Sequence, residues 1–320
     1  MRTNQFGQDI PEIRDILRNA DVRQYIRDTL ITILQALDVH FPDDNIDDFL
    51  RIADSDRTTL EKYEQEAHEY LQSLGVTERI PAKLSDRANL IYSQIKPFLL
   101  PGKVLDIGCG DGRVGELLAG DGLGNDVGDG VDVMLVDTYE HEHIKECRDK
   151  TGKRLQFRLM TDPKKVPIEI QTPSLPYNRR QLKPYDNTLL LTVLHHSSYP
   201  TATISEAKRL TRREGRIIVI ESVYGVSDDT SFGQLNHENQ RVANIFFDHL
   251  YNRVIHYSKN PRNPNQSSKK VNVPFNFNTP NSWRMFFEKY GLRQEGMFKL
   301  GIDQPCVPEY HTLHVLRKIN

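Results

Sequence analysis

The stretch KVLDIGCGDGRVGELLAG, residues 103–120, decides the fold of this chain. A short apolar run ends at Ile107, glycines follow at positions 108, 110 and 112, and a helix-compatible segment starts at Arg113. Glycine allows backbone conformations that other residues avoid and lets a ligand approach the backbone closely. The first turn of a helix also offers unpaired N–H groups. The pattern therefore predicts a strand, a ligand-binding loop and a helix.

The composition is that of an ordinary globular protein of 320 residues, with 42 basic against 44 acidic side chains and a formal net charge of -2. This balance provides no general attraction to nucleic acid or to an acidic membrane. The cysteines, Cys109, Cys147 and Cys306, stand far apart without metal-ligand spacing, which predicts a reducing compartment and no disulfide. The N-terminus has no apolar signal-peptide core, and no run reaches the roughly 18 apolar residues of a membrane span. We therefore expect a soluble, cytoplasmic protein that contacts no membrane.

Residues 1–95 show helical periodicity and no strand pattern. We expect Asp21 to cap a first helix, Gly75 to end a second one and Ser85 to cap a third. These residues predict a helical layer with one of two roles. It either covers the site as a cap or forms the contact surface of a homodimer.

From Lys103 onward, apolar runs alternate with helical patterns, which predicts an α/β fold with a mostly parallel sheet. We therefore assign residues 96–320 to one domain, with an insertion at about 223–279 that is rich in aromatic residues, His and Asn. The expected strands are residues 103–108, 131–137, 155–160, 187–194, 216–222, 293–300 and 310–318, the last two being a hairpin-like pair at the sheet edge.

The glycine loop favours S-adenosylmethionine (SAM) over a dinucleotide. A dinucleotide fingerprint is G-x-G-x-x-G, whereas the spacing here is G-x-G-x-G and Arg113 stands where the third dinucleotide glycine would be. Asp106 precedes the first glycine by two residues. A carboxylate there suits the ammonium group of SAM and is unfavourable beside a pyrophosphate.

These residues resemble the first motif of the class I SAM-dependent methyltransferases. The resemblance extends over residues 103–318 and includes YDNTLLLTVLHHSS, EAKRLTRREGRIIVIES and TPNSWRMFFEKYGL. It implies a Rossmann-like methyltransferase sheet of seven strands, mostly parallel with an antiparallel last strand. The N-terminal helical layer would be added to this sheet.

The resemblance also implies which residues hold SAM. Asp106 and the loop residues Gly108, Cys109, Gly110 and Gly112 would bind the methionine part. Asp162, after the third expected strand, would meet the adenine amino group. For the ribose hydroxyls, Asp137 at the end of the second strand is preferred, and Asp132 remains the alternative.

Three histidines are candidate bases for the proton that an acceptor loses. His195 and His196 follow the fourth strand, where ligands bind in open sheets. His249 lies on an expected helix of the insertion, on a face that we expect to meet solvent or a cleft. Tyr310 or His311 would border the same cleft. The structural alternative is that the pair packs the strand end and that His249 belongs to a solvated polar face.

The acceptor is expected to be a small molecule that is methylated at oxygen or nitrogen, with the N-terminal helices and the insertion forming its pocket. Alternatives are a protein or RNA methyltransferase, a SAM-binding module without turnover, and an NAD(P)-dependent oxidoreductase. The basic loop 259–270 has no interleaved aromatic residues, and no Asn-Pro-Pro-Tyr-like signature occurs, so nucleic acid is disfavoured. The Gly/Asp-rich residues 120–130 lack the carboxylate spacing of a calcium loop, so no metal is expected.

Overall fold

The computed structural model describes residues 2–39, 43–54, 59–120, 131–168, 184–255, 273–304 and 307–319. The loops at 121–130 and 259–270, on which the calcium and nucleic-acid arguments depend, lie outside the described residues. The chain divides into two compact units. The first consists of Met1–Ser85, Ser222–Pro280 and Leu300–His311, and the second of Asp86–Glu221, Asn281–Lys299 and Thr312–Asn320.

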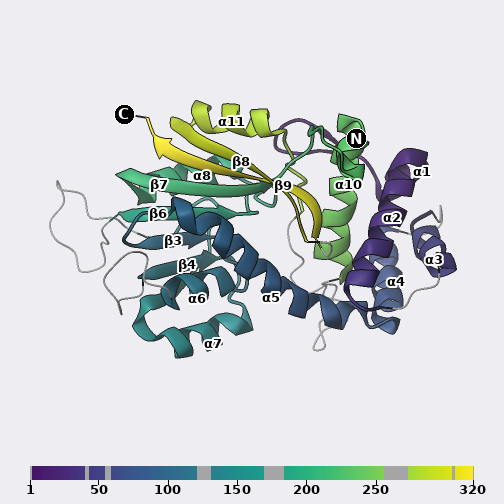
Figure 1. Cartoon of the computed structure of the whole chain (residues 1–320), viewed down its shortest axis with the longest axis horizontal. Helices are drawn as coiled ribbons and strands as arrows, with labels where there is room; N and C mark the ends of the chain where they lie inside the picture. Colours follow the sequence, from purple (N-terminus) through teal and green to yellow (C-terminus); the bar gives the residue numbers. More distant parts are fainter. Residues whose placement is uncertain are drawn as a thin grey trace. The chain divides into compact units, whose positions relative to one another are not determined.

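The chain forms the expected sheet of seven strands, in the order β5-β4-β3-β6-β7-β9-β8 (Figure 1), and most of its residues belong to the second unit. The pairs β3–β4, β4–β5, β3–β6 and β6–β7 are parallel. This confirms the Rossmann-like methyltransferase sheet. The strands are β3 (Val104–Ile107), β4 (Val133–Asp137), β5 (Leu155–Leu159), β6 (Tyr185–Leu191), β7 (Thr211–Ser222), β8 (Leu292–Gln304) and β9 (Val307–Lys318).

The last strand in the chain runs antiparallel to β7. Lys318, near the end of β9, donates a hydrogen bond to the carbonyl of Thr211 at the start of β7. Val223, just after β7, donates its N–H to the carbonyl of Tyr310, near the start of β9, at 2.8 Å. The expected edge pair is present, but β9 lies inside the sheet and β8 forms the edge.

Helices cover the sheet because their apolar stripes match the apolar strand faces. Helices α6 (Arg113–Gly120) and α7 (Glu142–Thr151) pack against each other and against β4 and β5 (Figure 1). Helix α8 (Pro200–Leu210) packs on β6. Helix α11 (Pro280–Lys289) buries Trp283 and Phe287, whose rings stack with centroids 5.9 Å apart. The aromatic face of this helix is therefore its core face.

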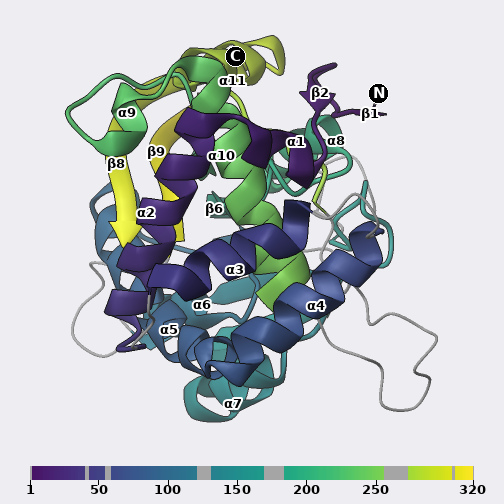
Figure 2. The same cartoon turned by 90° about the vertical axis from the view of Figure 1, so that its right-hand side faces the viewer.

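The first unit joins the N-terminal helices to the segment after β7. Figure 2 shows its helices gathered around α10, which contacts both α1 and α2. Every residue of α10 from Asn239 to His249 is buried, so this helix is the centre of the unit. Its helices are α1 (Ile13–Arg18), α2 (Ala20–Ala36), α3 (Asp43–Asp54), α4 (Leu60–Ser73), α9 (Ser231–Gln234), α10 (His237–His249) and the π-helix η3 (Leu250–Ile255), and α5 (Val76–Ile95) crosses the boundary between the units.

Several local predictions for the N-terminal residues are wrong. The side chain of Asn19, not Asp21, caps α2 by accepting from two backbone N–H groups. Helix α5 begins at Val76 and continues to Ile95, so no helix starts at residue 85. Two short strands, β1 (Arg2–Thr3) and β2 (Asp9–Ile10), form an antiparallel pair where no strand was expected. Caps and short pairs depend on side-chain geometry that periodicity does not report.

The polar face of α10 that carries His249 is buried, although we expected it to meet solvent or a cleft. Asp248 is fully buried and His249 is only 4 % exposed. The His249 ring stacks on Tyr63 of α4, and its Nε2 atom lies 3.6 Å from a carboxylate oxygen of the buried Glu64. His249 is therefore covered inside the first unit by α4, an N-terminal helix.

Candidate functional site

The candidate SAM site lies at the carboxyl ends of neighbouring strands in the second unit. Strand β3 pairs with β4 on one side and with β6 on the other, all in parallel register. The glycine loop after β3, Asp137 at the end of β4 and the segment that follows β6 therefore share one edge of the sheet. Ligands bind at this edge in open α/β sheets, at the point where the strand order reverses.

The loop glycines serve two different purposes. Gly108, Gly110 and Gly112 all have positive φ, at 75°, 55° and 80°. A Cβ atom on Gly112 would lie 3.0 Å from Leu135 and 3.2 Å from Ile144, so this glycine allows close packing. A Cβ atom on Gly110 would meet nothing within 4 Å. Gly110 therefore faces open space, where a ligand could approach the backbone.

Asp106 has the properties expected of a partner for a cation. Its residue surface is 1 % exposed, and its Oδ1 atom has no hydrogen-bond partner among the described residues. Burial, together with the negative charges of Asp137 and Asp111, raises the pKa of Asp106 to about 7. A buried carboxyl oxygen without a partner is costly, so a donor from a ligand would stabilise it. The residues present therefore fit the ammonium group of SAM.

The acids proposed for the ribose and adenine lie in different surroundings. Asp137 is half-buried and accepts a hydrogen bond from the N–H of Gly110 at 2.9 Å. Burial raises the pKa of Asp137, and backbone N–H groups of the loop and of Thr138 oppose this shift. The Asp132 side chain is 61 % exposed and lies 3.8 Å from the ammonium of Lys103. Asp162 is exposed, beyond the end of β5, and accepts from the N–H of Lys164.

Cys109 occupies the loop between the first two glycines and is half-buried. Burial raises the pKa of its thiol, with the charge of Asp106 adding to the effect. The thiol therefore stays neutral near pH 7, so Cys109 contributes backbone and shape to the loop rather than a thiolate.

His195 is held by Glu221 at the end of β7. Its Nδ1 atom lies 2.6 Å from a Glu221 oxygen, and both side chains are at most 1 % exposed. Burial and the charge of Arg87 lower the pKa of His195 to about 3, so the imidazole is neutral at pH 7. Burial raises the pKa of Glu221 to about 7, although backbone N–H groups oppose the shift. A neutral, buried His195 that is bound to Glu221 is suited to positioning the turn after β6, rather than to accepting a proton.

Glu221 also supports a strained turn after β6. Thr192, a β-branched residue, has a φ of 57°, which is unfavourable for such a side chain. The carboxylate of Glu221 accepts from the N–H groups of Val193 and Leu194 at 3.0 and 2.6 Å. Val193 in turn packs against the loop, since a Cβ atom on Gly108 would come within 2.6 Å of it. The turn therefore links the end of β6 to the SAM loop.

The remaining candidates lie as follows. His196 is half-buried directly after this turn, with its ring centroid 4.0 Å from that of His195. His249, Tyr310 and His311 belong to the first unit, and all three are buried. The cleft-border position expected for Tyr310 or His311 stays a prediction.

Sequence reasoning missed the role of Glu221. Its position was visible at the end of the apolar run RIIVIES, but its partner lies 26 residues earlier in the chain. When two strands are known to be neighbours, an acid at the end of one and a histidine after the end of the other predict a His–carboxylate pair. The strand order supplies that knowledge.

The sheet order, the glycine loop and the buried acid define a class I SAM-dependent methyltransferase. A family model described as a methyltransferase domain matches residues 76–293, which is more than half of the chain. The chain belongs to this methyltransferase domain family, and its cofactor is SAM. A comparison with curated protein sequences gives no significant match.

Solved structures of methyltransferases are similar to this chain at low identity. The 1,6-didemethyltoxoflavin N1-methyltransferase of Burkholderia thailandensis is 15% identical, with a TM-score of 0.48, over 83% of this chain and 94% of that one. An O-methyltransferase of neocarzinostatin biosynthesis is 14% identical, with a TM-score of 0.47, over 86% and 70%. A SAM-dependent methyltransferase of Aquifex aeolicus is 14% identical, with a TM-score of 0.41, over 70% and 88%. At these values the similarities carry no argument about the acceptor.

Among the helices that the structure describes, none combines the length and the apolar character that crossing a bilayer requires.

Proposed function

We propose that this methyltransferase transfers the methyl group of SAM to an oxygen or nitrogen atom of a small molecule, and that His196 accepts the proton that the acceptor loses. One observation carries the proposal. His196 follows the turn after β6, and that turn packs directly against the glycine loop through Val193 and Gly108.

The two neighbouring histidines have different surroundings, which supports different roles. His195 is buried and bound to Glu221, so it orients the turn. His196 is half-buried, so it is more accessible to a ligand at the strand ends. Histidine is the side chain whose unperturbed pKa suits proton transfer near neutral pH.

Methyl transfer requires the protein to bind the donor, hold the acceptor and accept a proton. SAM, when bound, supplies a methyl group that its sulfonium activates for in-line displacement. Asp106 and the loop backbone hold the donor, and the acceptor must be held at roughly 3–3.5 Å with water excluded. His196 takes the acceptor's proton as the acceptor lone pair attacks the methyl carbon and the carbon–sulfur bond breaks.

Charge and sequence both favour a small acceptor over a nucleic acid. The formal net charge of -2 provides no general attraction to phosphates. The sequence LTVLHHS stands where amino-group nucleic-acid methyltransferases carry a signature that holds a flipped base. In addition, the N-terminal helices and the segment after β7, which we expect to recognise the acceptor, belong to one compact unit.

A methyl-transfer screen tests the proposal. The full chain is incubated with SAM labelled in its methyl group and with separate pools of small molecules, proteins and RNA. We expect label in the small-molecule pool. Label only in protein or RNA, or SAM binding without transfer to any pool, contradicts the proposed acceptor class.

The identified acceptor then allows a test of His196. His196→Ala should lower kcat by roughly 10²- to 10⁴-fold, the usual contribution of general base catalysis. SAM affinity, measured by calorimetry, should stay unchanged. An unchanged kcat assigns the proton to solvent or to another residue and removes His196 from the proposal.

A further inference from the structure

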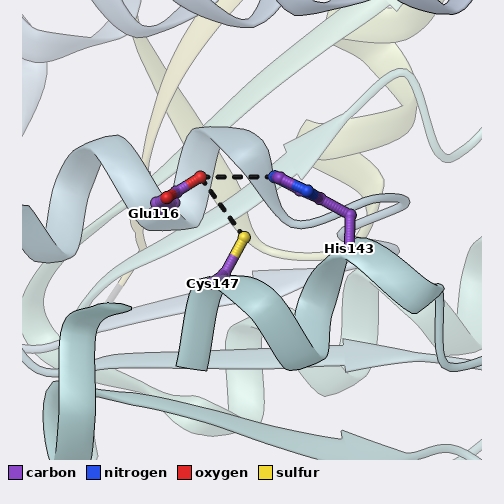
Figure 3. A group of neighbouring side chains, drawn as sticks. All are labelled: Glu116, His143 and Cys147. Carbon is purple, nitrogen blue, oxygen red and sulfur yellow. Dashed lines mark hydrogen bonds and ion pairs between the residues drawn. The ribbon is translucent and has the colours of Figure 1, made fainter. Parts of the chain in front are cut away.

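A cluster of three different metal-ligand side chains lies between α6 and α7, apart from the SAM loop. Glu116 comes from α6, and His143 and Cys147 come from α7 (Figure 3). His143 and Cys147 are four residues apart, so they lie on the same face of their helix. Figure 3 shows both side chains pointing towards the Glu116 carboxylate. The side chains of two packed helices therefore meet at one point.

The spacing of the three ligand atoms suits a tetrahedral ion. The same oxygen of Glu116, Oε2, lies 3.3 Å from His143 Nε2 and 3.3 Å from Cys147 Sγ. The nitrogen, sulfur and oxygen atoms all lie within 4.8 Å of one another. Neighbouring ligands of tetrahedral zinc are about 3.3–3.8 Å apart, given bonds of roughly 2.0–2.3 Å. Small side-chain adjustments would bring an ion within bonding distance of all three.

The outer atoms of the cluster already have partners of the kind that orient metal ligands. The other ring nitrogen of His143, Nδ1, lies 3.3 Å from the Glu146 carboxylate. The other oxygen of Glu116 lies 3.3 Å from the ammonium of Lys150. A carboxylate on the far side of a ligating histidine and a hydrogen bond to a ligating carboxylate are common around zinc. The remaining atoms, Glu116 Oε2, His143 Nε2 and Cys147 Sγ, face one another.

We propose that Glu116, His143 and Cys147 bind one Zn²⁺ ion, with water as the fourth ligand. A thiolate and a carboxylate balance the charge of the ion, and the charges of Lys150 and Glu146 outside the cluster cancel each other. The sulfur and nitrogen donors favour zinc over Ca²⁺ or Mg²⁺, which prefer oxygen. Cys147 is buried, whereas the His143 and Glu116 side chains are 15% and 23% exposed, which leaves an entry path and space for water.

The ion would join two helices that follow directly from the SAM site. Helix α6 starts at the end of the glycine loop, and α7 follows Asp137 and its turn. A Cβ atom on Gly112 would lie 3.2 Å from Ile144 of α7, so loop and helix are already in contact. We therefore assign the ion a structural role that stabilises this part of the second unit. The cysteines alone gave no sign of it, because the ligand set combines one cysteine with His and Glu.

Cobalt serves as the spectroscopic probe. The tag-free full chain is stripped with a chelator and titrated with Co²⁺, which takes the same tetrahedral sites as zinc but absorbs light. We expect one Co²⁺ per chain, visible bands of a tetrahedral ion and a near-ultraviolet band from a sulfur-to-cobalt transition. Zn²⁺ should displace the cobalt and raise the unfolding temperature, since it binds the folded state. Neither readout depends on methyl transfer.

Matched variants locate the site. Cys147→Ser should abolish the sulfur-to-cobalt band, whereas Cys109→Ser should retain it. His143→Gln should abolish tight binding, whereas His141→Gln, an exposed histidine at the start of the same helix, should not. Glu146→Gln, which alters only the orienting partner of His143, should weaken zinc binding by roughly 10- to 100-fold.

The outcomes are decisive even if one variant fails to fold. Circular dichroism verifies the fold of each variant, and His143→Gln, at a partly exposed position, stands in for Cys147→Ser if the latter unfolds. Absence of the sulfur-to-cobalt band in the unmodified chain overturns the proposal. Persistence of the band in folded Cys147→Ser, or equal affinity in folded His143→Gln, overturns it as well.

Discussion

The Oδ2 atom of Asp137 accepts a hydrogen bond from the backbone N–H of Gly110 at 2.9 Å. Asp137, at the end of β4, therefore fixes the backbone of Gly110 in the glycine loop that follows β3. Its other oxygen accepts from the N–H of Thr138 at 2.6 Å. Asp137 is thus placed beside the loop by contacts on both oxygens, and this favours it over Asp132 as the acid of the SAM site.

The two aspartates should differ in their effect on SAM binding. Asp137→Ala should weaken SAM binding roughly ten- to hundredfold, because it removes charge-assisted hydrogen bonds worth about 1.5–3 kcal/mol. Asp132→Ala should leave affinity nearly unchanged, because the Asp132 side chain is largely exposed and only pairs with Lys103. Isothermal titration calorimetry with SAM measures both. The reverse order would move the ribose contact to Asp132.

Gly110→Val should abolish measurable SAM binding while the protein stays folded. The new side chain would occupy the open space in front of the loop, and the positive φ of 55° would add a strain of about 1–3 kcal/mol.

Gly152→Val is the matched control for that strain. Gly152 also has a positive φ, of 63°, and a Cβ atom there would meet nothing within 4 Å, but it lies at the end of α7. It should cost similar stability without changing SAM affinity. Equal affinity in both variants would show that the loop does not hold SAM.

SAM affinity should fall as the pH drops below about 7. Burial raises the pKa of Asp106 to about 7, and an ammonium group is bound by the carboxylate form. The dissociation constant should therefore rise up to about tenfold for each pH unit below that value. Calorimetry between pH 5 and pH 8 measures this, with Asp106→Asn as the control that should bind weakly and without this slope.

The same pKa shift has an opposite effect on the free protein. The folded pKa of Asp106 lies above its unfolded value of 3.8. The folded state therefore binds the proton more tightly, and the contribution of Asp106 to stability decreases as the pH rises from about 4 to about 7. A stability slope of that sign should be smaller in Asp106→Asn, measured by urea unfolding. If stability depended equally on pH in the unmodified chain and in Asp106→Asn, Asp106 would not be the group whose pKa is raised on folding.

Glu221→Ala should destabilise the chain by at least about 3 kcal/mol, because several buried N–H groups lose their acceptor at about 1–3 kcal/mol each. The turn at Thr192 loses the contacts that hold its positive φ. Glu221→Gln keeps one oxygen and should cost less. The surface variant Glu288→Ala, which breaks only an exposed pair with Arg284, should cost at most about 0.5 kcal/mol. Urea unfolding compares the three, and a loss for Glu221→Ala no larger than that for Glu288→Ala would exclude the supporting role.

The sheet could be predicted from the sequence because its signals are local. The central strands contain short apolar runs, such as residues 133–137 and 187–191, which are bounded by turn residues or helical patterns. The glycine loop was equally readable, since glycine is the residue that most readily adopts the positive φ found at Gly108, Gly110 and Gly112. The family resemblance implied seven strands, mostly parallel with an antiparallel last strand, and the sheet in the structure agrees with this.

The environments of the histidines were not predictable in the same way. His195 and His196 are adjacent in the sequence, yet only His195 is buried against Glu221. His249 follows a pattern typical of a polar helix face, but Tyr63 and Glu64 cover it. The partners come from distant parts of the chain, so periodicity along one helix or strand does not report them.

The sequence by itself determined the class of this protein, because the strand, the glycine loop and the acid at Asp106 are encoded within a few consecutive residues. Only the tertiary structure decided which side chains act together: Asp137 with Gly110, Glu221 with His195, and Glu116 with His143 and Cys147. The physical reason is that burial, pKa shifts and ligand geometry arise from contacts between segments that the chain order keeps apart.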